Sequence, residues 1–335
     1  MPNRRFVCGF ALAPLVSRWA RAQPLTKSFR VGLLSNFLAP VTVGRLWEGF
    51  IQALQQQGFV EGKNVTFELR NAEGMSERLP AMAADLVRLG VDVIVVGGSA
   101  AGPGVRAAKD ATHVIPIVMA GITDPVGQGL IASLAKPGGN ITGVADFFAE
   151  LEPKRLELLK TAAPGVGKVT RLIAPLQLAG RRLSESADES VMSKAAETLG
   201  VRLSSVLLSS PDGFEKAMAA IVRDRPHALL VSTVPLFFRL RKEIADFAIA
   251  QRLPTASSPR EMASAGILLS YGSDLLNNSV KAGALVGKIL NGAKPGDIPV
   301  EQPDKFEIVI NLSTAKTLGL TLPRSLIIQA NELIT

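Results

Sequence analysis

Three polar or glycine-rich segments directly follow short apolar runs, and they are the best candidates for contact with a ligand. They are Ser35–Asn36, Gly97–Ala100 and Ala120–Asp124. Ligands of open α/β sheets bind in the crevice outside the carboxyl ends of the strands, so these segments would meet at one edge if the apolar runs are strands. Backbone N–H groups at residues 99–100, where a helix is expected to begin, would attract an anionic group such as a carboxylate.

Asp124 is the acid in this set, and two roles are open for it. Its carboxylate could pair with the ammonium group of a ligand, in a charge-assisted hydrogen bond. Asp124 is also followed by Pro125, and a cap residue followed by proline is a start signal for a helix. The two roles are compatible, and the sequence does not choose between them.

The sequence contains no recognisable catalytic or metal-binding constellation. Gly102-Pro-Gly104 only imitates a dinucleotide-binding fingerprint, because it follows the third predicted strand and Pro103 occupies the turn. The chain has two histidines and one cysteine, which argues against a histidine-rich or cysteine-cluster metal site. We therefore expect a binding protein and not an enzyme, with no catalytic residues, no metal and no cofactor.

The composition is that of a globular protein, with 335 residues, of which 47% are hydrophobic and 20% charged. The longest uncharged run has 14 residues, Val31–Gly44, which is shorter than the roughly 18–20 apolar residues of a membrane-spanning helix. The net charge of +8 includes four arginines in the first 22 residues, so 8 − 4 leaves +4 for the remainder. These charges are scattered, whereas nucleic-acid binding needs a concentrated basic surface.

Residues 1–22 have the three parts of a secretory signal peptide. A basic pair at Arg4-Arg5 precedes the apolar stretch Phe6–Val16, and the segment ends in Ala20-Arg21-Ala22. We expect cleavage before Gln23 and a periplasmic protein. The sequence leaves open whether export uses the general or the twin-arginine route, and the alternative interpretation of this segment is a buried first helix.

Beyond the signal, short β-branched runs alternate with segments of helical period, which indicates parallel sheets covered by helices on both faces. This alternation of strand and helix patterns occurs in two successive sets, and Ile141–Phe148 lies between them. Two sets predict two lobes, with the first crossing at Ile141–Phe148. The predicted strands are 31–35, 65–69, 91–96, 115–119, 169–174, 201–207, 228–232, 267–270 and 306–311. The predicted helices are 43–57, 76–89, 125–134, 184–199, 212–223, 237–251, 275–290 and 313–318.

Several motifs resemble those of the periplasmic substrate-binding proteins of ABC-type importers, in the group related to tryptophan- and tyrosine-binding proteins. The resemblance covers nearly the whole chain after the signal. Its most specific part is the tail from Gln302 to Leu320. The other motifs are Gly58–Val65, Arg78–Val87, Thr123–Val126, Leu134–Val144, Lys154–Leu159 and Ser270–Gly272.

This resemblance implies an α/β type I periplasmic-binding fold, with two lobes, each a parallel sheet flanked by helices, and three hinge crossings. Residues 28–145 plus 267–299 would form lobe 1, and residues 146–266 plus 300–335 would form lobe 2. The segment Pro175–Gly180 departs from the Asn-Pro-rich loop usual in the family, which leaves the second-lobe half of the pocket open. By position, the resemblance implies a ligand cleft lined by Ser35, Asn36, Gly98, Ser99, Ala100, Asp124, Arg260 and Tyr271.

The function implied is that of an extracytoplasmic receptor. It would capture a small amino-acid-like or aromatic or carboxylate solute by hinge closure and deliver it to an ABC permease and its ATPase. We expect a monomer, with no nucleic-acid partner and no stable membrane insertion. The alternatives are a secreted ligand-sensing module for a membrane receptor and an α/β enzyme that uses the glycine-rich loop for a cofactor.

We predict that the exported protein begins at Gln23, because the basic, apolar and Ala-x-Ala parts occur in the order of a signal peptide. Intact-mass measurement of the protein recovered from the periplasm tests this. A mass that still includes residues 1–22 would contradict the prediction.

Overall fold

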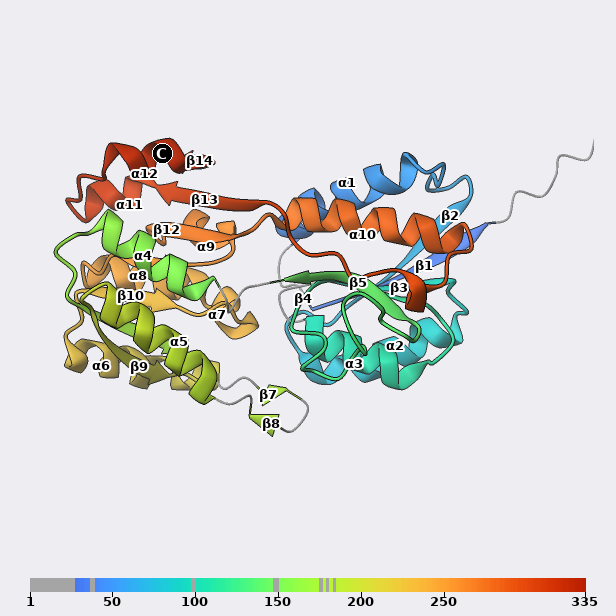
Figure 1. Ribbon diagram of the computed structural model, residues 1–335, viewed down its shortest axis with the longest axis horizontal. Coiled ribbons are helices and arrows are strands. Elements are labelled where there is room, and N and C mark those ends of the chain that lie inside the picture. The colour runs from blue at the N-terminus through green and yellow to red at the C-terminus, as the bar shows by residue number, and fades with distance from the viewer. Residues whose placement is uncertain are drawn as a thin grey trace, which may run out of the picture.

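The chain forms two α/β lobes that lie side by side along the long axis of the molecule (Figure 1). A computed structural model describes residues 28–36, 40–97, 101–146, 151–174, 177–178, 181–182 and 185–335. The first lobe holds a five-stranded sheet in the order β2-β1-β3-β4-β5, and the second a seven-stranded sheet in the order β14-β13-β12-β11-β10-β6-β9. This confirms the predicted two-lobed α/β architecture.

The first sheet is parallel throughout and is covered on both faces. Its central strand β3 has four buried residues in succession, as expected where helices cover both sides. Helices α1 and α10 lie on one face, and α2 and α3 lie on the other (Figure 1). The elements are β1 (Phe29–Ser35), α1 (Pro40–Gln55), β2 (Val65–Asn71), η1 (Ser76–Arg78), α2 (Leu79–Arg88), β3 (Val93–Gly97), α3 (Ala101–Ala111), β4 (Ile117–Thr123), β5 (Ile141–Asp146) and α10 (Leu275–Leu290).

The second sheet is mixed, because β13 runs antiparallel to β12. This differs from the expected parallel sheet: β13 follows the last crossing between the lobes, so it enters beside the carboxyl end of β12 and must run the opposite way. Its strands are β6 (Lys168–Ile173), β9 (Arg202–Leu207), β10 (Ala228–Val231), β11 (Thr255–Ser257), β12 (Leu269–Ser273), β13 (Phe306–Asn311) and β14 (Glu332–Ile334). A separate hairpin consists of β7 (Gln177–Leu178) and β8 (Arg181–Arg182).

The helices of the second lobe enclose two clusters of buried apolar side chains, one on each face of the sheet. The longer helices are α4 (Glu152–Ala162), α5 (Glu185–Thr198), α6 (Phe214–Asp224) and α8 (Arg241–Ala250). The shorter ones are η2 (Pro211–Gly213), α7 (Pro235–Arg239), α9 (Arg260–Ser264), α11 (Leu312–Thr317) and α12 (Arg324–Gln329). The short helix η3 (Pro295–Asp297) lies beside β5 in the first lobe.

Two crossings between the lobes lie later in the chain than the sequence predicts. We expected residues 267–299 in the first lobe, but β12 pairs with β11 and β13 in the second sheet. The chain crosses only at Asp274, whose carboxylate caps α10 by accepting the Asn277 N–H at 3.0 Å. The third crossing follows Glu301, which still hydrogen-bonds to β5 of the first lobe. The apolar residues of β12 fill the second core, which keeps that strand in the second lobe.

The helix predicted after Asp124 is absent, and residues 125–130 form turns instead. The Gln128 N–H donates to the carbonyl oxygen of Asp124, and the Leu130 N–H donates to the carbonyl oxygen of Pro125. These two bonds form a compact turn that does not continue as a helix. Gly129 then adopts a φ of +66°, which a right-handed helix does not allow and which glycine adopts at little cost. The predicted helix is therefore wrong: Asp124 caps a single turn, and the positive φ of Gly129 prevents that turn from continuing as a helix.

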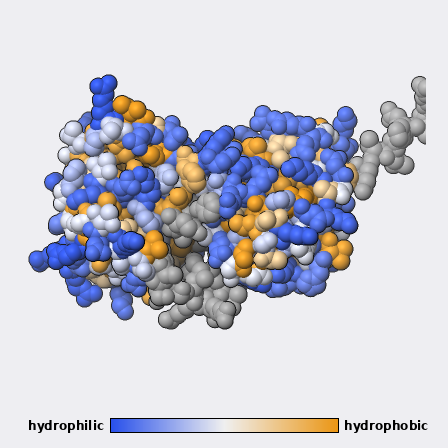
Figure 2. Space-filling model, in the orientation of Figure 1, coloured by the Kyte–Doolittle hydropathy of each residue, from blue (hydrophilic) through white to orange (hydrophobic). Residues whose placement is uncertain are grey.

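The surface mixes hydrophilic and hydrophobic residues over both lobes on the face that Figure 2 shows. Within the described ranges, none of the helices is both long and apolar enough to cross a membrane. Most large apolar side chains lie in the cores of the two lobes.

Asp224, at the end of α6, stabilises the outer edge of the second sheet. Its carboxylate accepts hydrogen bonds from Lys168 Nζ at 2.6 Å, Thr170 Oγ1 at 2.5 Å and Ser204 Oγ at 2.6 Å. Burial alone would raise the pKa of Asp224, but the hydrogen bonds from Lys168, Ser204 and Thr170 outweigh it and lower the pKa to about 2. The ionised carboxylate therefore ties α6 to β6 and β9.

We predict that Asp224→Asn lowers the free energy of unfolding at pH 7 by about 1 kcal/mol, a modest value because water partly screens this site. The pKa of Asp224 is lower in the folded protein than in the unfolded chain. Its contribution is therefore present above about pH 4 and lost as the pH falls towards 2. Urea unfolding of both proteins across this pH range tests the prediction. Equal stability at pH 7 would contradict it.

Candidate functional site

The carboxyl ends of the parallel strands in both sheets face the junction between the lobes. β5 ends at Asp146, where the chain first crosses, and β12 ends at Ser273, just before the second crossing. β1, β3 and β4 run parallel to β5. β6, β10 and β11 run parallel to β12, so their ends face the same junction (Figure 1). The predicted crevice would therefore lie between the two sheets, and we call this junction of strand ends the interlobe cleft.

A buried carboxylate holds two of the crossings together. Asp146 Oδ1 accepts a hydrogen bond from Ser273 Oγ at 2.6 Å, and Asp146 Oδ2 accepts one from Asn278 Nδ2 at 3.3 Å. All three side chains are at most 2% exposed. Asp146 therefore links the end of β5 to the end of β12 and to the first turn of α10.

Beneath the second-lobe side of the cleft lies a group of buried charges. Glu152 forms an ion pair with Arg171 of β6 and accepts a hydrogen bond from Ser232 Oγ at 2.6 Å. Arg155 is fully buried and donates from Nε to the carbonyl oxygen of Tyr271 at 2.7 Å. Burial lowers the pKa of Arg155 to about 10, although Glu152 and Asp146 counteract this shift. These contacts fix the start of α4 against three strands of the second sheet.

Two first-lobe candidates, Ser35 and Asn36, lie at the carboxyl edge of the sheet, as predicted. Ser35 ends β1, and Asn36 follows it. Asn36 is 9% exposed and donates from Nδ2 to Ser76 Oγ at 3.0 Å. Its other amide atom, Oδ1, is buried and has no hydrogen-bond partner among the described residues. The three remaining candidates of this lobe's glycine-rich loop, Gly98, Ser99 and Ala100, lie outside the described residues.

Of the two roles predicted for Asp124, the structure contains the capping contact. The residue caps a turn and not a helix. Its Oδ1 accepts the Gly127 N–H at 2.8 Å. A Cβ atom at Gly127 would lie 1.9 Å from Asp124 Oδ2, so the carboxylate is folded over its own turn. The residue is exposed and has a φ of +44°.

The second-lobe candidates Arg260 and Tyr271 have partners within their own lobe. Arg260 begins α9 and forms an ion pair with Glu332 of β14. Burial lowers the pKa of Arg260, but the hydrogen bond and charge of Glu332 outweigh it, so the pKa is raised. Tyr271 lies in β12 with its ring centroid 6.2 Å from that of Phe306. Its ring packs against the core of the second lobe.

A group of charges at the rim of the junction has no counterpart among the residues predicted from the sequence. Arg45 of α1 belongs to the first lobe, and Glu261 of α9 and Glu307 of β13 belong to the second. Burial and, to a smaller extent, the charge of Asp274 raise the pKa of Glu307, and Arg260 and Arg45 oppose the shift. The net result is a pKa of about 7. Burial also raises the pKa of Glu261, against the charges of Arg260 and Arg45. No sequence motif marks these residues, because charges on short helices and strand starts usually lie in solvent.

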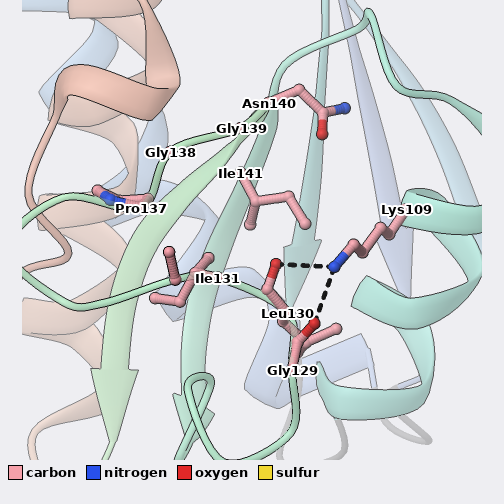
Figure 3. Close-up of a pocket in the computed structure, with 10 residues that line it drawn as sticks. Lys109, Gly129, Leu130, Ile131, Pro137, Gly138, Gly139, Asn140 and Ile141 are labelled. Atoms are coloured by element: carbon pink, nitrogen blue, oxygen red, sulfur yellow. Dashed lines mark hydrogen bonds between the residues drawn. The ribbon is translucent and has the colours of Figure 1, made fainter.

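A separate pocket of about 360 Å³ opens in the first lobe between the end of α3 and the segment that leads into β5 (Figure 3). Lys109 Nζ donates to the carbonyl oxygens of Gly129 at 2.8 Å and Leu130 at 3.1 Å. The pocket also contacts Ile141, the first residue of β5. It therefore lies at the amino ends of the strands, at the opposite edge of the sheet from the interlobe cleft. In the part of the chain that the structure describes, no group of three or more His, Cys, Asp or Glu residues is arranged to hold a metal ion.

Comparisons with known proteins agree with this geometry. Residues 37–334 match the family described as ABC transporter substrate binding protein. A tyrosine-binding protein of Clostridioides difficile is 29% identical over 289 residues, which cover 86% of this chain and 80% of that protein. The structure of a Streptococcus pneumoniae ABC domain in complex with L-Trp is 26% identical, with a TM-score of 0.80, and covers 92% of this chain and 100% of that one. A conserved domain protein of Vibrio cholerae has the same fold, with a TM-score of 0.81 at 24% identity over 92% of this chain and 100% of that one.

We predict that Glu307→Gln changes the pH dependence of stability. The pKa of Glu307 is raised from 4.5 to about 7 in the folded protein, so its stabilising contribution is full below pH 4.5 and is lost as the pH rises through 7. Relative to wild type, the variant should gain about 1–2 kcal/mol of unfolding free energy between pH 5 and pH 8. Urea unfolding at the two pH values measures this. The same pH dependence in both proteins would refute the assignment.

Proposed function

The chain belongs to the ABC transporter substrate-binding protein family, and we propose that it is a receptor that captures an amino acid with an aromatic side chain and delivers it to an ABC importer. The observation that carries this proposal is the placement of the carboxyl edges of the two sheets, which face each other across three crossings. Open α/β sheets bind ligands at this edge. A solute placed there would contact both lobes.

The ligand class is proposed from two relatives whose names state what they bind. One is called a tyrosine-binding protein, and the other was solved in complex with L-Trp. In this chain, we propose that Ser35 and Asn36 contact the solute from the first lobe and that Arg260 faces it from the second. Gly98, Ser99 and Ala100 belong to the same proposed site by their place after β3, and Asp124 and Tyr271 by their family position.

The proposed mechanism is closure of the two lobes about the crossings. A ligand that contacts both lobes favours the closed state by the difference in its contacts between the two states. A few residues at the ends of β5 and β12 and before β13 would absorb the change in backbone angles, as is usual for hinges. Arg45 of the first lobe and the acids Glu261 and Glu307 of the second interact electrostatically, so their attraction would assist closure at a pH where the acids are ionised.

The proposed location is the periplasm, reached after cleavage before Gln23. There the closed, loaded receptor would dock as a monomer on an ABC permease driven by its ATPase. Release of the solute would follow when the permease favours the open state of the receptor, because affinity depends on the population of the closed state.

We predict that L-tyrosine or L-tryptophan raises the unfolding temperature of the mature protein in a concentration-dependent way. A ligand that binds only the folded state adds about 2.7 kcal/mol of stability at a concentration of 100 Kd. This corresponds to a shift of several degrees for a protein of this size. Thermal unfolding with each of the amino acids, with aromatic acids and with small dicarboxylates measures the effect. A shift with dicarboxylates alone would contradict the proposed ligand class, and no shift with any solute would contradict the receptor function.

A further inference from the structure

A positively charged residue of the first lobe lies opposite two acids of the second lobe at the junction. α1 follows β1 and α9 follows β11, and both strands end at the edge that faces the junction. Arg45 lies in the second turn of α1, and Glu261 lies in the first turn of α9. Glu307 is the second residue of β13 and pairs with Gly272, next to the end of β12. The three residues therefore belong to elements that begin on opposite sides of the same junction.

Packing between α1 and α10 places Arg45 beside the second crossing. Gly49 of α1 lies against Leu276, since a Cβ atom added to Gly49 would come within 2.6 Å of Leu276 Cδ1. Leu276 belongs to the first turn of α10, which begins directly after the crossing at Asp274. Residues four apart lie on the same face of a helix. Arg45 is therefore one turn from Gly49, towards the end of α1 that meets the second lobe.

The charges of these residues already act on one another. Both acids are half-buried, and Arg45 is exposed and takes part in none of the ion pairs among the described residues. The charge of Arg45 nevertheless opposes the rise that burial causes in the pKa of Glu261 and of Glu307. Attraction between charges weakens with distance. The arginine is therefore close enough for a small movement of the lobes to change the attraction.

Acids outnumber cations on the second-lobe side of this group. Arg260 is engaged in an ion pair with Glu332, and Asp274 and Glu261 disfavour the charge of Glu307 by repulsion. A positive charge supplied by the first lobe would therefore stabilise the ionised acids. The acids of the group are Glu261, Glu307, Glu332 and the crossing residue Asp274, and its cations on this side are Arg260 and Arg241.

We propose that Arg45 forms an interlobe ion-pair latch with Glu307 and Glu261, which strengthens as the receptor closes and weakens when the acids bind protons. This inference rests on the proposed receptor function and adds to it a control of solute affinity by pH and salt. The latch acts without contact to the solute. It raises the affinity because apparent affinity increases with the population of the closed state.

The direction of the pH effect follows from the ionisation of Glu307. With a pKa of about 7, its carboxyl group is neutral well below pH 7 and charged well above it. Arg45 attracts only the charged form, so closure favours loss of the proton. By linkage, solute affinity rises as the pH rises through 7. The part of this rise that depends on Arg45 is the signature of the latch.

Calorimetric titration of the mature protein with L-tyrosine and L-tryptophan at about pH 5.5 and about pH 8.5 tests the latch. We expect Arg45→Gln to weaken binding about two- to fivefold at the higher pH, as for a partly exposed ion pair, and to leave it nearly unchanged at the lower pH. In a Glu307→Gln protein the same substitution should have a smaller effect at the higher pH, because one partner is absent. High salt should also reduce the effect.

Arg223→Gln and Glu197→Gln are the matched controls. Both residues are exposed on helices of the second lobe, near the ends of α6 and α5. These helix ends lead into the amino ends of β10 and β9, at the edge of the sheet opposite the junction. Each control removes one charge, as Arg45→Gln and Glu307→Gln do, and should leave the affinity and its pH dependence unchanged.

A second measurement needs no solute. Cys8 is the one cysteine of the chain and lies in residues 1–22, so Val126→Cys and Ser209→Cys give the mature protein a unique pair of sites for spin labels. Both residues are exposed and follow strand ends that face the junction, one in each lobe. We expect the distance between the labels in the unliganded protein to shorten from about pH 5.5 to about pH 8.5. Arg45→Gln should remove most of this change.

Equal affinities of wild type and Arg45→Gln at both pH values would overturn the latch but leave the receptor function intact. The same loss of affinity at both pH values would also overturn it, because Arg45 would then act independently of the acids. Absence of binding by both amino acids would contradict the proposed ligand class, and the label distance would then decide on the latch. A distance that does not change with pH, or that changes equally in Arg45→Gln, would exclude it.

Discussion

The two-lobed arrangement depends on a charge buried at the junction, the carboxylate of Asp146. A buried carboxylate is costly unless its oxygens are hydrogen-bonded, and here the donors come from Ser273 in the second lobe and Asn278 in the first. The first two crossings must therefore stay together. The third joins them through the hydrogen bond from the Asp274 N–H to the carbonyl oxygen of Lys305 at 3.0 Å. Because the crossings are held at the ends of β5 and β12, the carboxyl edges of both sheets are brought face to face.

Both sides of the junction contain buried polar groups, some paired within the chain and some without a hydrogen-bond partner among the described residues. On the second-lobe side, Glu152, Arg171 and Ser232 satisfy one another in the interior. Removing one member of a buried ion pair leaves an uncompensated charge, so such a group holds its lobe in one geometry. Asn36 Oδ1 on the first-lobe side, and Thr233 Oγ1 and Ser258 Oγ after β10 and β11 on the second, lack a partner among the described residues.

Much of the architecture follows from local sequence, but the lobe boundaries do not. The apolar runs of β1 and β3 and the periodic apolar faces of α2 and α10 are local features, and they predicted elements that the structure contains. Which sheet β12 joins depends on pairing with β11 and β13, whose partners lie far apart in the chain. The start signal at Asp124 likewise could not reveal that Gly129 would adopt a positive φ and end the turn.

The predicted site shows the same division. Placement of Ser35 and Asn36 at the end of β1 follows from the pattern of the strand, but the bond from Asn36 to Ser76 joins residues 40 positions apart. The approach of Arg45 to Glu261 and Glu307 depends on the folding of both lobes, and sequence spacing carries no trace of it. Closure of the two lobes on a solute can be measured by small-angle X-ray scattering of the mature protein. The measurement compares the protein alone with the protein at a saturating concentration of an amino acid that it binds. We expect a smaller radius of gyration in the loaded protein, whereas an unchanged radius at saturation would exclude closure.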